Sequence, residues 1–385
     1  KCGRTQRPRM SDDPAPPVTD EAREDWQEAF SQPIAGGPTT RGFDFYFGVD
    51  VPNWPPYCFI ENDRMLGIPS RYLPPDLLEN NQASLPGPAL AGWELEDILP
   101  SLRDHACRYV EGRAGEPEPF FLYLPLTSPH TPLAVNEPWK GKSGLNLYAD
   151  FVMETDAVVG AVMEAVERSD TADDTLFIFT SDNGCAPYIG VSDLEEMGHY
   201  PSAHYRGYKA DAWDGGHRIP FIARWPGRIE PASRCARTIC LTDLIATCAD
   251  ISGADLPEDA GEDSISIRPL LEGEDRELRE EVVHHAIHGK FAIRSGTWKL
   301  VLCAGSGGWA SPTDEEAEEQ GLPPVQLYDM EADPGEEHNR QAEHPEVVEK
   351  LTHHLEALVN RGRTTEGPQL SNDVPVDIWK RQERQ

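Results

Sequence analysis

The chain has few basic side chains for its length. Its 385 residues contain 34 lysines and arginines against 67 aspartates and glutamates, which gives a formal net charge of −33. Nucleic-acid binding depends on basic side chains that contact phosphates, so this balance argues against nucleic acid as a partner. A strongly anionic polymer would also be an awkward ligand unless basic side chains clustered at its binding site. We therefore expect a mostly acidic, solvated surface.

Long apolar runs are missing as well. The longest candidates lie near residues 119–126 and 175–180, and both are far shorter than the roughly 20 residues that a membrane-spanning helix needs. The eight cysteines follow neither a metal-binding spacing nor the pattern of a small secreted domain. Most are expected to be buried thiols, although a disulfide or two stays open. The sequence therefore predicts no membrane span and no cysteine metal site.

The most informative segment that is present runs from residue 175 to residue 187. It begins with the apolar, β-branched and aromatic run TLFIFT, as expected of a buried strand. Asp182 and Asn183 follow at the carboxyl end of that strand, where open α/β sheets place their ligands. A carboxylate beside an amide carbonyl suits calcium or magnesium better than zinc. Taken alone, the Asp-Asn-Gly triplet could equally be a common turn.

Two further segments carry residues of catalytic type. Residues 117–133 read as another buried strand, which ends at His130 between two prolines. Residues 207–220 place Lys209 six residues before a glycine pair, and a strand follows them. We predict that His130, Lys209, Asp182 and Asn183 converge in one cleft, because each follows or flanks a buried strand whose carboxyl end should face the same rim.

The pattern of helices and strands predicts a large α/β domain followed by a smaller one. Up to residue 255, buried strands alternate with helices, which is typical of a mainly parallel sheet with helices on both faces. The helices are predicted near residues 19–30, 100–112, 145–168 and 242–250. Later residues predict a hairpin over 291–302, a short strand and an amphipathic helix. We expect an α/β domain at 1–255 and a smaller α+β domain with an antiparallel sheet at 256–385.

Together with Gly42-Phe43-Asp44 near the start, these segments resemble the sulfatase family of the alkaline-phosphatase superfamily. The resemblance runs from about residue 37 to residue 339. It implies an alkaline-phosphatase-like fold, hydrolysis of aryl or carbohydrate sulfate esters, and a periplasmic or secreted location. It also implies a calcium ion bound by Asp182 and Asn183, with catalytic roles for His130 and Lys209. A divalent ion and a lysine would stabilise charge on the sulfuryl oxygens, and the imidazole would protonate the departing alkoxide.

The nucleophile motif of that family is not found here. Sulfatases make a formylglycine from the first residue of Cys/Ser-x-Pro-x-Arg, and no cysteine or serine of this chain has that full context. The nearest match, at Cys185, has Ile189 in place of the arginine. The early aspartate pair that completes the calcium shell is also absent. We therefore expect the sequence to be roughly the C-terminal three-quarters of a sulfatase, with the formylglycine upstream and the chain as given inactive.

Two other functions stay open. One is a phosphodiesterase or phosphonate monoester hydrolase on the same fold. Its two-zinc members usually place a histidine where Asn183 stands, so Asn183 favours a sulfatase. The other is a catalytically inactive binding protein that kept the fold and lost the nucleophile.

Secondary roles are expected for a few neighbouring residues. Asp214 and Arg218 are expected to hold the glycine pair against the sheet. His199, His204 and Tyr205 could line a substrate pocket or lie on an exposed loop. The sequence does not specify the oligomeric state.

Overall fold

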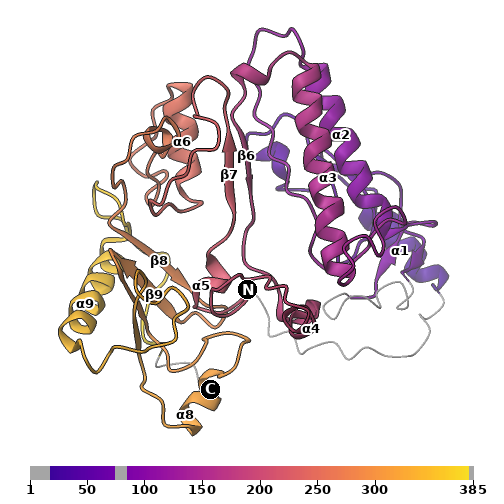
Figure 1. Ribbon diagram of the computed structural model, residues 1–385. Coiled ribbons are helices and arrows are strands. Elements are labelled where there is room, and N and C mark those ends of the chain that lie inside the picture. Colours follow the sequence, from indigo (N-terminus) through magenta and orange to yellow (C-terminus); the bar gives the residue numbers. More distant parts are fainter. Residues whose placement is uncertain (1–17, 74–84, 381–385) are drawn as a thin grey trace. The chain divides into compact units, whose positions relative to one another are not determined.

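The computed structural model describes residues 18–73 and 85–380 (Figure 1). Contacts divide the chain into a first unit, residues 1–172, and a second unit, residues 173–385. This division falls earlier than the boundary expected at residue 255. The reason lies in the second unit, where the segment 206–217 is hydrogen-bonded to residues 284–310 instead of forming a separate body. The domain boundary at 255 stays a prediction.

Two helices form the main body of the first unit. They are α2 (Ile98–Gly112) and α3 (Leu147–Arg168), which lie side by side in Figure 1. Buried apolar side chains recur on each turn of α2 and form one stripe. The proline in its first turn is tolerated, because the N–H that proline lacks would have no partner within the helix at that position. The Asn146 side chain caps α3 by accepting a hydrogen bond from the backbone N–H of Ala149. Both helices confirm the predictions.

The rest of the first unit is short elements and ordered loops. Helix α1 (Asp20–Phe30) also matches its prediction and is capped by Thr19. The strands pair antiparallel as β1-β2-β3 and β4-β5. Their bounds are β1 Phe47–Gly48, β2 Ile60–Glu61, β3 Arg64–Met65, β4 Arg71–Tyr72 and β5 Pro88–Ala89. The 3-10 helices are η1 Pro38–Thr40, η3 Leu95–Asp97 and, at the border of the two units, η4 Ala172–Asp174.

The strand predicted near residues 119–126 does not form. These residues alternate between half-buried and exposed side chains, and Phe121 and Tyr123 are 64% and 66% exposed. Among the described residues, no other backbone pairs with this segment in a ladder. Its two prolines, Pro119 and Pro125, have no N–H to donate. The prediction of a buried strand at residues 119–126 is therefore wrong.

The second unit begins with a two-stranded ladder. Strand β6 (Phe177–Thr180) pairs antiparallel with β7 (Phe221–Arg224), with Phe177 opposite Arg224 and Thr180 opposite Phe221. Both strands lie where they were predicted, but β6 is half-buried along its length and not the fully buried strand that its composition predicts. Their antiparallel pairing differs from the expected parallel sheet: in the described ranges, ladders between named strands are antiparallel, and one isolated parallel bridge joins Tyr57 to Ala89.

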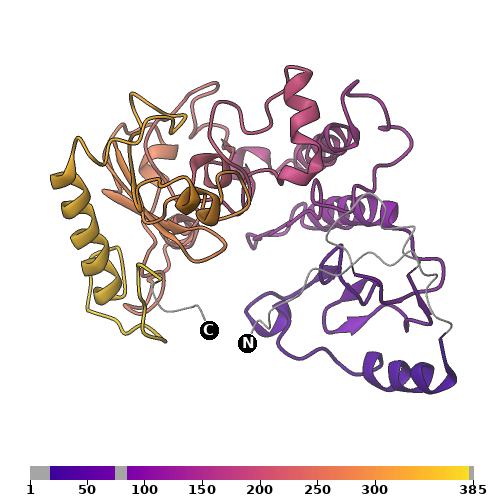
Figure 2. The same ribbon diagram turned by 90° about the horizontal axis from the view of Figure 1, so that it is seen from below.

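A four-stranded antiparallel sheet follows, as predicted for the end of the chain. Its order is β11-β10-β9-β8, and β9 and β10 form the hairpin expected around Gly296. The strands are β8 Glu281–His285, β9 Phe291–Ser295, β10 Trp298–Val301 and β11 Gln326–Asp329. Helix α9 (Pro345–Arg361) lies beside this sheet (Figures 1 and 2). It packs on the sheet through Leu351, Leu355 and Leu358.

The opposite face of that sheet is covered by a segment from earlier in the chain. Ala212 and Trp213 pack there against a second apolar cluster of the sheet and its loops. The sheet is therefore enclosed by α9 on one side and by the residues around Trp213 on the other. The remaining helices of this unit are η5 Pro187–Ile189, α4 Val191–Glu196, α5 Asp214–His217, α6 Asp243–Ser252, α7 Arg268–Leu271 and α8 Asp314–Glu319.

Among the described residues, no helix is both long and apolar enough to cross a membrane. The seven described cysteines are free thiols, so they form no disulfide with one another; Cys2 lies outside the described residues.

Candidate functional site

The predicted metal pair lies in the turn that leaves β6. Asp182 is exposed, and its Oδ1 accepts a hydrogen bond of 3.0 Å from the backbone N–H of Asn183. The Nδ2 of Asn183 donates to the carbonyl of Gly184 at 2.9 Å, and the Ser181 hydroxyl donates to the Asn183 carbonyl. These bonds fix the turn and direct the Asn183 amide, so a carboxylate and an amide oxygen are presented by neighbouring residues.

Glycines let this turn pack directly against the segment that carries Lys209. The N–H of Gly184 donates to the carbonyl of Gly216 at 3.0 Å, and the N–H of Lys209 donates to the carbonyl of Cys185 at 2.8 Å. A Cβ atom on Gly184 would overlap the Gly215 carbonyl oxygen. Only a residue without a side chain fits this backbone contact, so the glycines bring Lys209 next to the Asp182–Asn183 turn.

Lys209 is half-buried, and its backbone is held on both sides. Asp211 accepts hydrogen bonds from the N–H groups of Tyr208, Trp309 and Ala310, at 2.8, 2.7 and 3.0 Å. Within residues 18–73 and 85–380, the ammonium of Lys209 makes neither a hydrogen bond nor an ion pair. The charge of Lys209 is therefore available to a ligand.

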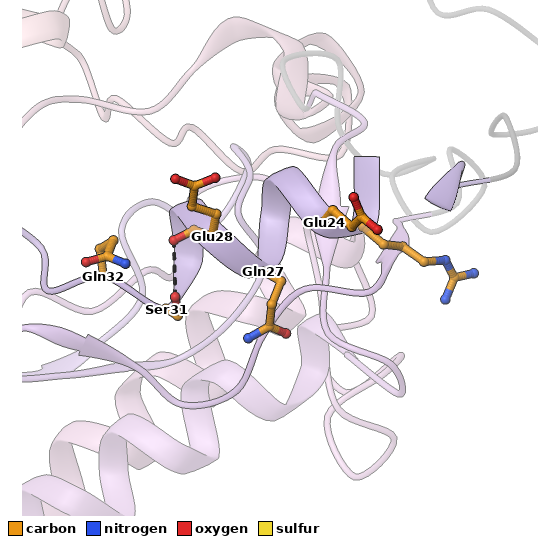
Figure 3. A pocket seen from close by; sticks show the side chains of 6 residues that line it. Glu24, Gln27, Glu28, Ser31 and Gln32 are labelled. Atoms are coloured by element: carbon orange, nitrogen blue, oxygen red, sulfur yellow. Dashed lines mark hydrogen bonds between the residues drawn. The ribbon is translucent and has the colours of Figure 1, made fainter. Parts of the chain in front are cut away.

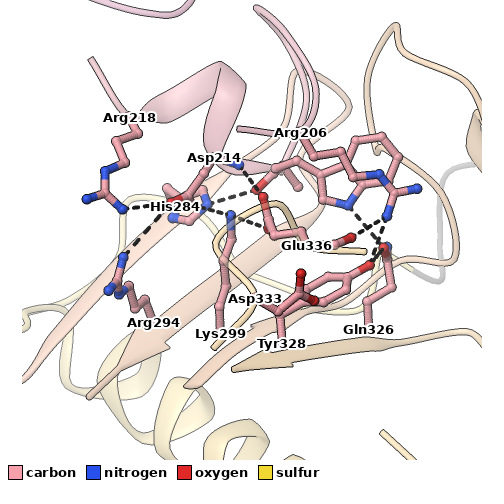
Figure 4. A network of polar contacts seen from close by, with 12 residues as sticks. Arg206, Asp214, Arg218, His284, Arg294, Lys299, Gln326, Tyr328, Asp333 and Glu336 are labelled. Atoms are coloured by element: carbon pink, nitrogen blue, oxygen red, sulfur yellow. Dashed lines mark hydrogen bonds and ion pairs between the residues drawn. The ribbon is translucent and has the colours of Figure 1, made fainter. Parts of the chain in front are cut away.

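A buried charge cluster forms around Asp214, five residues after Lys209. The Lys299 ammonium, on β10, is 2.7 Å from Asp214 Oδ1 and 2.8 Å from Glu336 Oε1 (Figure 4). The other oxygen of Glu336 accepts the backbone N–H of Asp214 at 2.6 Å. Burial would raise the pKa of Asp214, but the Lys299 ammonium outweighs it and holds that pKa below its usual value. Burial raises the pKa of Glu336 despite the same lysine.

A second set of contacts surrounds Trp213. The guanidinium of Arg206 lies 3.7 Å from the centre of the Trp213 ring and donates to the Glu336 carbonyl at 2.8 Å. The indole N–H of Trp213 donates to Gln326 Oε1 at 3.0 Å, and the hydroxyl of Tyr328 donates to the same oxygen (Figure 4). Asp214 was expected to be structural, and these contacts agree. Sequence reasoning missed Lys299, Glu336 and Arg206, because nothing local marks a lysine in a strand as buried.

Two histidines lie beside this cluster. The rings of His217 and His284 are 4.2 Å apart, and His284 Nε2 is 3.1 Å from the Ala212 carbonyl. Burial, and then the Lys299 charge, lower the pKa of His284 well below its usual 6.5. The same two causes lower the pKa of His217 to about 4, although the residue as a whole is exposed. Both imidazoles are therefore neutral near pH 7.

His130 belongs to the first unit. Its Nδ1 is 2.5 Å from the carbonyl oxygen of Thr131, and since that oxygen can only accept, Nδ1 carries the proton. The neighbouring Ser128 hydroxyl accepts a hydrogen bond of 2.7 Å from Thr155 of α3, which ties the His130 loop to that helix.

The remaining predicted positions have local contacts. The rings of His204 and Tyr205 lie 4.2 Å apart, and the Arg218 guanidinium lies 4.6 Å from the Tyr205 ring. Arg218 also approaches Asp214 at 3.8 Å, in agreement with a structural role. His199 follows α4, and its N–H donates to the Leu194 carbonyl.

Three of the four predicted site residues, Asp182, Asn183 and Lys209, therefore lie on backbone segments in direct contact within the second unit. Their convergence with His130 stays a prediction, because His130 belongs to the first unit. In the described ranges, no group of three or more His, Cys, Asp or Glu side chains could hold a metal ion. A shallow surface depression along α1, shown in Figure 3, is lined by solvent-facing polar residues and carries none of this chemistry.

Comparison with known proteins identifies the family. Residues 37–254 match the sequence profile of the Sulfatase family. An N-acetylgalactosamine-6-O-sulfatase of Bacteroides thetaiotaomicron is 35% identical over 272 residues, which cover 70% of this chain and 52% of that protein. Arylsulfatase A of Bos taurus is 31% identical over 280 residues, or 67% of this chain and 53% of that protein. The chain thus spans about half the length of the curated relatives it matches.

Solved structures agree. A structure from a study of glycosaminoglycan metabolism by Bacteroides thetaiotaomicron superposes with a TM-score of 0.73 at 28% identity, over 86% of this chain and 75% of that one. A sulfatase from Pseudoalteromonas shares the fold, with a TM-score of 0.56 at 23% identity over 69% of this chain and 54% of that one. The chain belongs to the sulfatase family and has its alkaline-phosphatase-like fold.

Proposed function

We propose that this protein is part of a sulfatase that hydrolyses sulfate esters, with carbohydrate sulfates as the first substrates to examine. The observation that carries the proposal is the backbone contact that brings Lys209 beside the Asp182–Asn183 turn. The name of the Bacteroides thetaiotaomicron relative, which specifies a sulfated N-acetylgalactosamine, supports a sulfated sugar. Aryl sulfates stay open, since Arylsulfatase A is also a relative.

In this proposal Lys209 binds the sulfuryl group. Its ammonium is not engaged by any described residue, and its backbone is fixed at positions 208, 209 and 211. A pre-positioned cation of this kind stabilises negative charge that develops on the sulfuryl oxygens without having to reorganise. Lys209 would therefore lower the barrier to S–O cleavage more than it strengthens ground-state binding.

His130 is proposed as the general acid. In that role the ring would act as an imidazolium: it would give one proton to the departing alkoxide and become neutral, while Nδ1 keeps its hydrogen bond to the Thr131 carbonyl. The contact between Thr155 and Ser128 keeps the loop in place for that transfer. This role requires His130 and Lys209 to face the same substrate, which is the convergence predicted from the sequence.

The oxygens of Asp182 and Asn183 fit a calcium ion by type. Calcium takes oxygen ligands, but it normally takes about six to eight of them, and these two residues supply only part of that number. We propose that they hold calcium together with ligands from outside the described residues. When bound, the ion would add positive charge beside the sulfuryl group.

The nucleophile is proposed to be a formylglycine contributed from outside these 385 residues, because the chain contains no Cys/Ser-x-Pro-x-Arg. In this proposal Lys209, Asp182, Asn183 and His130 bind charge and transfer a proton, so the attack on sulfur is assigned to the formylglycine.

The test compares residues 1–385 with the same chain extended at its N-terminus to include the nucleophile motif. We expect no turnover of an aryl sulfate or of N-acetylgalactosamine 6-sulfate by the short form, and turnover by the extended form with calcium. Lys209→Ala should reduce kcat of the extended form at least 100-fold, a loss typical of removing one charge-stabilising donor. Lys350→Ala, at an exposed position on α9, is the control and should change little.

Two results would count against the proposal. Robust turnover by residues 1–385 would show that a nucleophile exists within this chain. An extended form that binds a sulfated sugar but never releases sulfate would favour the inactive binding protein.

A further inference from the structure

The C-terminal sheet contributes a lysine that no predicted role accounts for. Lys299 lies on β10, and its side chain is 0% exposed. It forms ion pairs with Asp214, at the start of α5, and with Glu336, in the turn after β11. A charge buried this deeply is costly unless its partners are fixed, and such clusters often contribute little net stability. The cluster therefore calls for a reason other than stability.

What the cluster fixes is the segment that carries Lys209. Glu336 binds both the Lys299 ammonium and the backbone N–H of Asp214, five residues after Lys209 (Figure 4). Its backbone carbonyl accepts from Arg206, three residues before Lys209. The cluster thus anchors the segment at both of its ends.

The middle of the segment is held by the same part of the chain. Asp211 accepts the N–H groups of Trp309 and Ala310, and the N–H of Ala212 donates to the Ser306 carbonyl at 2.8 Å. Residues on both sides of Lys209 are therefore fixed, while its ammonium has no partner among the described residues. This contrast between a fixed backbone and an unengaged charge suits a side chain that is presented to a ligand.

We infer that Lys299 is a positioning residue: by pairing with Asp214 and Glu336 it holds the 206–217 segment so that Lys209 faces the Asp182–Asn183 turn. Lys299 is fully buried, so it acts only through that segment. The role of Lys209 in this inference rests on the proposed function. The anchoring of the 206–217 segment by Lys299 does not depend on that function.

Anchoring is tested in residues 1–385 by hydrogen–deuterium exchange with the variant Lys299→Met, which keeps the length of the side chain and removes its charge. We expect exchange in residues 206–217 to accelerate at least tenfold, with exchange in α9 unchanged. Unchanged exchange in residues 206–217 would overturn the inference. If Lys299→Met does not fold, Glu336→Gln takes its place, because glutamine keeps an acceptor for the Asp214 N–H. We then expect exchange in residues 206–217 to accelerate about threefold. Unchanged exchange in this variant would also overturn the inference.

The link to Lys209 is tested in the extended, active form by combining two substitutions. If Lys299 acts through Lys209, Lys299→Met should lower kcat at least tenfold with KM changed less than threefold, and should have no further effect once Lys209 is alanine. An equal loss in both backgrounds would mean a purely structural role and would overturn the inference. If the parent released no sulfate, the proposed function would fail, and the exchange experiment would still decide whether Lys299 anchors the segment.

Discussion

At the scale of single residues, the candidate site depends on the missing side chain of Gly184 as much as on the lysine side chain at position 209. The two segments of the site meet backbone to backbone, and a methyl group at Gly184 would occupy the position of the Gly215 carbonyl. The backbone segment that carries Lys209 can pack against the turn after Asn183 only because that space is left empty.

Replacing Gly184 with alanine should therefore separate the two segments. We expect Gly184→Ala to lower the free energy of unfolding by about 1–3 kcal/mol, as overpacking generally does. The midpoint of urea denaturation measures the change. Gly160→Ala, at a glycine of α3 with nothing within 4 Å of its Cβ, is the matched control. It should be stabilising by about 0.5–1 kcal/mol. Equal effects at the two positions would contradict the close contact at Gly184.

The neutral imidazole of His284 should make the protein sensitive to mild acid. In the unfolded chain a histidine takes up a proton near its usual pKa of 6.5, whereas in the folded protein the pKa of His284 lies well below that value. The unfolded state then binds more protons as pH falls below about 6.5. Stability should be complete above that pH and decline below it, by at most about 1.4 kcal/mol per pH unit for this group.

Urea titrations between pH 7.5 and 5 measure the decline, and His284→Gln should make it shallower. His353→Gln, at an exposed position on α9, should leave it as in the parent. A His284→Gln variant whose stability changes with pH as steeply as that of the parent would contradict the lowered pKa of His284.

At the scale of secondary structure, most of the elements predicted from the sequence form, whereas the short strands of the first unit were not predicted. Amphipathic periodicity and helix caps are local signals, and α2, α3 and α9 form within a few residues of their predicted bounds. The hairpin around Gly296 is local as well, because the turn residues themselves set its register.

The predictions that were wrong or missed at this scale depend on contacts between residues that are distant in the sequence. Residues 119–126 have the composition of a buried strand, but a strand exists only where another backbone completes its ladder, and composition does not say where that backbone is. The same limit explains why Lys299 was missed. Asp214, Lys299 and Glu336 are separated by 85 and 37 positions, so no local pattern links them. Asp182, Asn183 and Lys209 were predicted as site residues because their local segments resemble sulfatase motifs, and their roles stay predictions.

At the scale of the whole molecule, the dominant property is its charge. A net charge of −33 means that the folded chain repels itself more than the expanded chain does. Salt shortens the range of this repulsion, from about 30 Å at 0.01 M to about 3 Å at 1 M.

The thermal midpoint should consequently rise with salt. Between 10 mM and 500 mM NaCl we expect a gain of about 1 kcal/mol, or about 2–4 °C in Tm for units of this size. Differential scanning calorimetry measures the shift, and KCl at equal concentration should act alike if screening is the cause. A Tm that falls with salt would mean that exposed ion pairs outweigh the repulsion.

Because the C-terminal sheet is enclosed between α9 and Trp213, it limits where a shorter fragment of this protein can end. A polypeptide ended at residue 255, where the sequence suggests a boundary, would keep Lys209 but lose the strands beneath it. Trp213 would be left without Gln326, and Asp214 without its counter-ion Lys299. We therefore expect that the smallest piece that keeps the segment around Lys209 in place extends past Glu336.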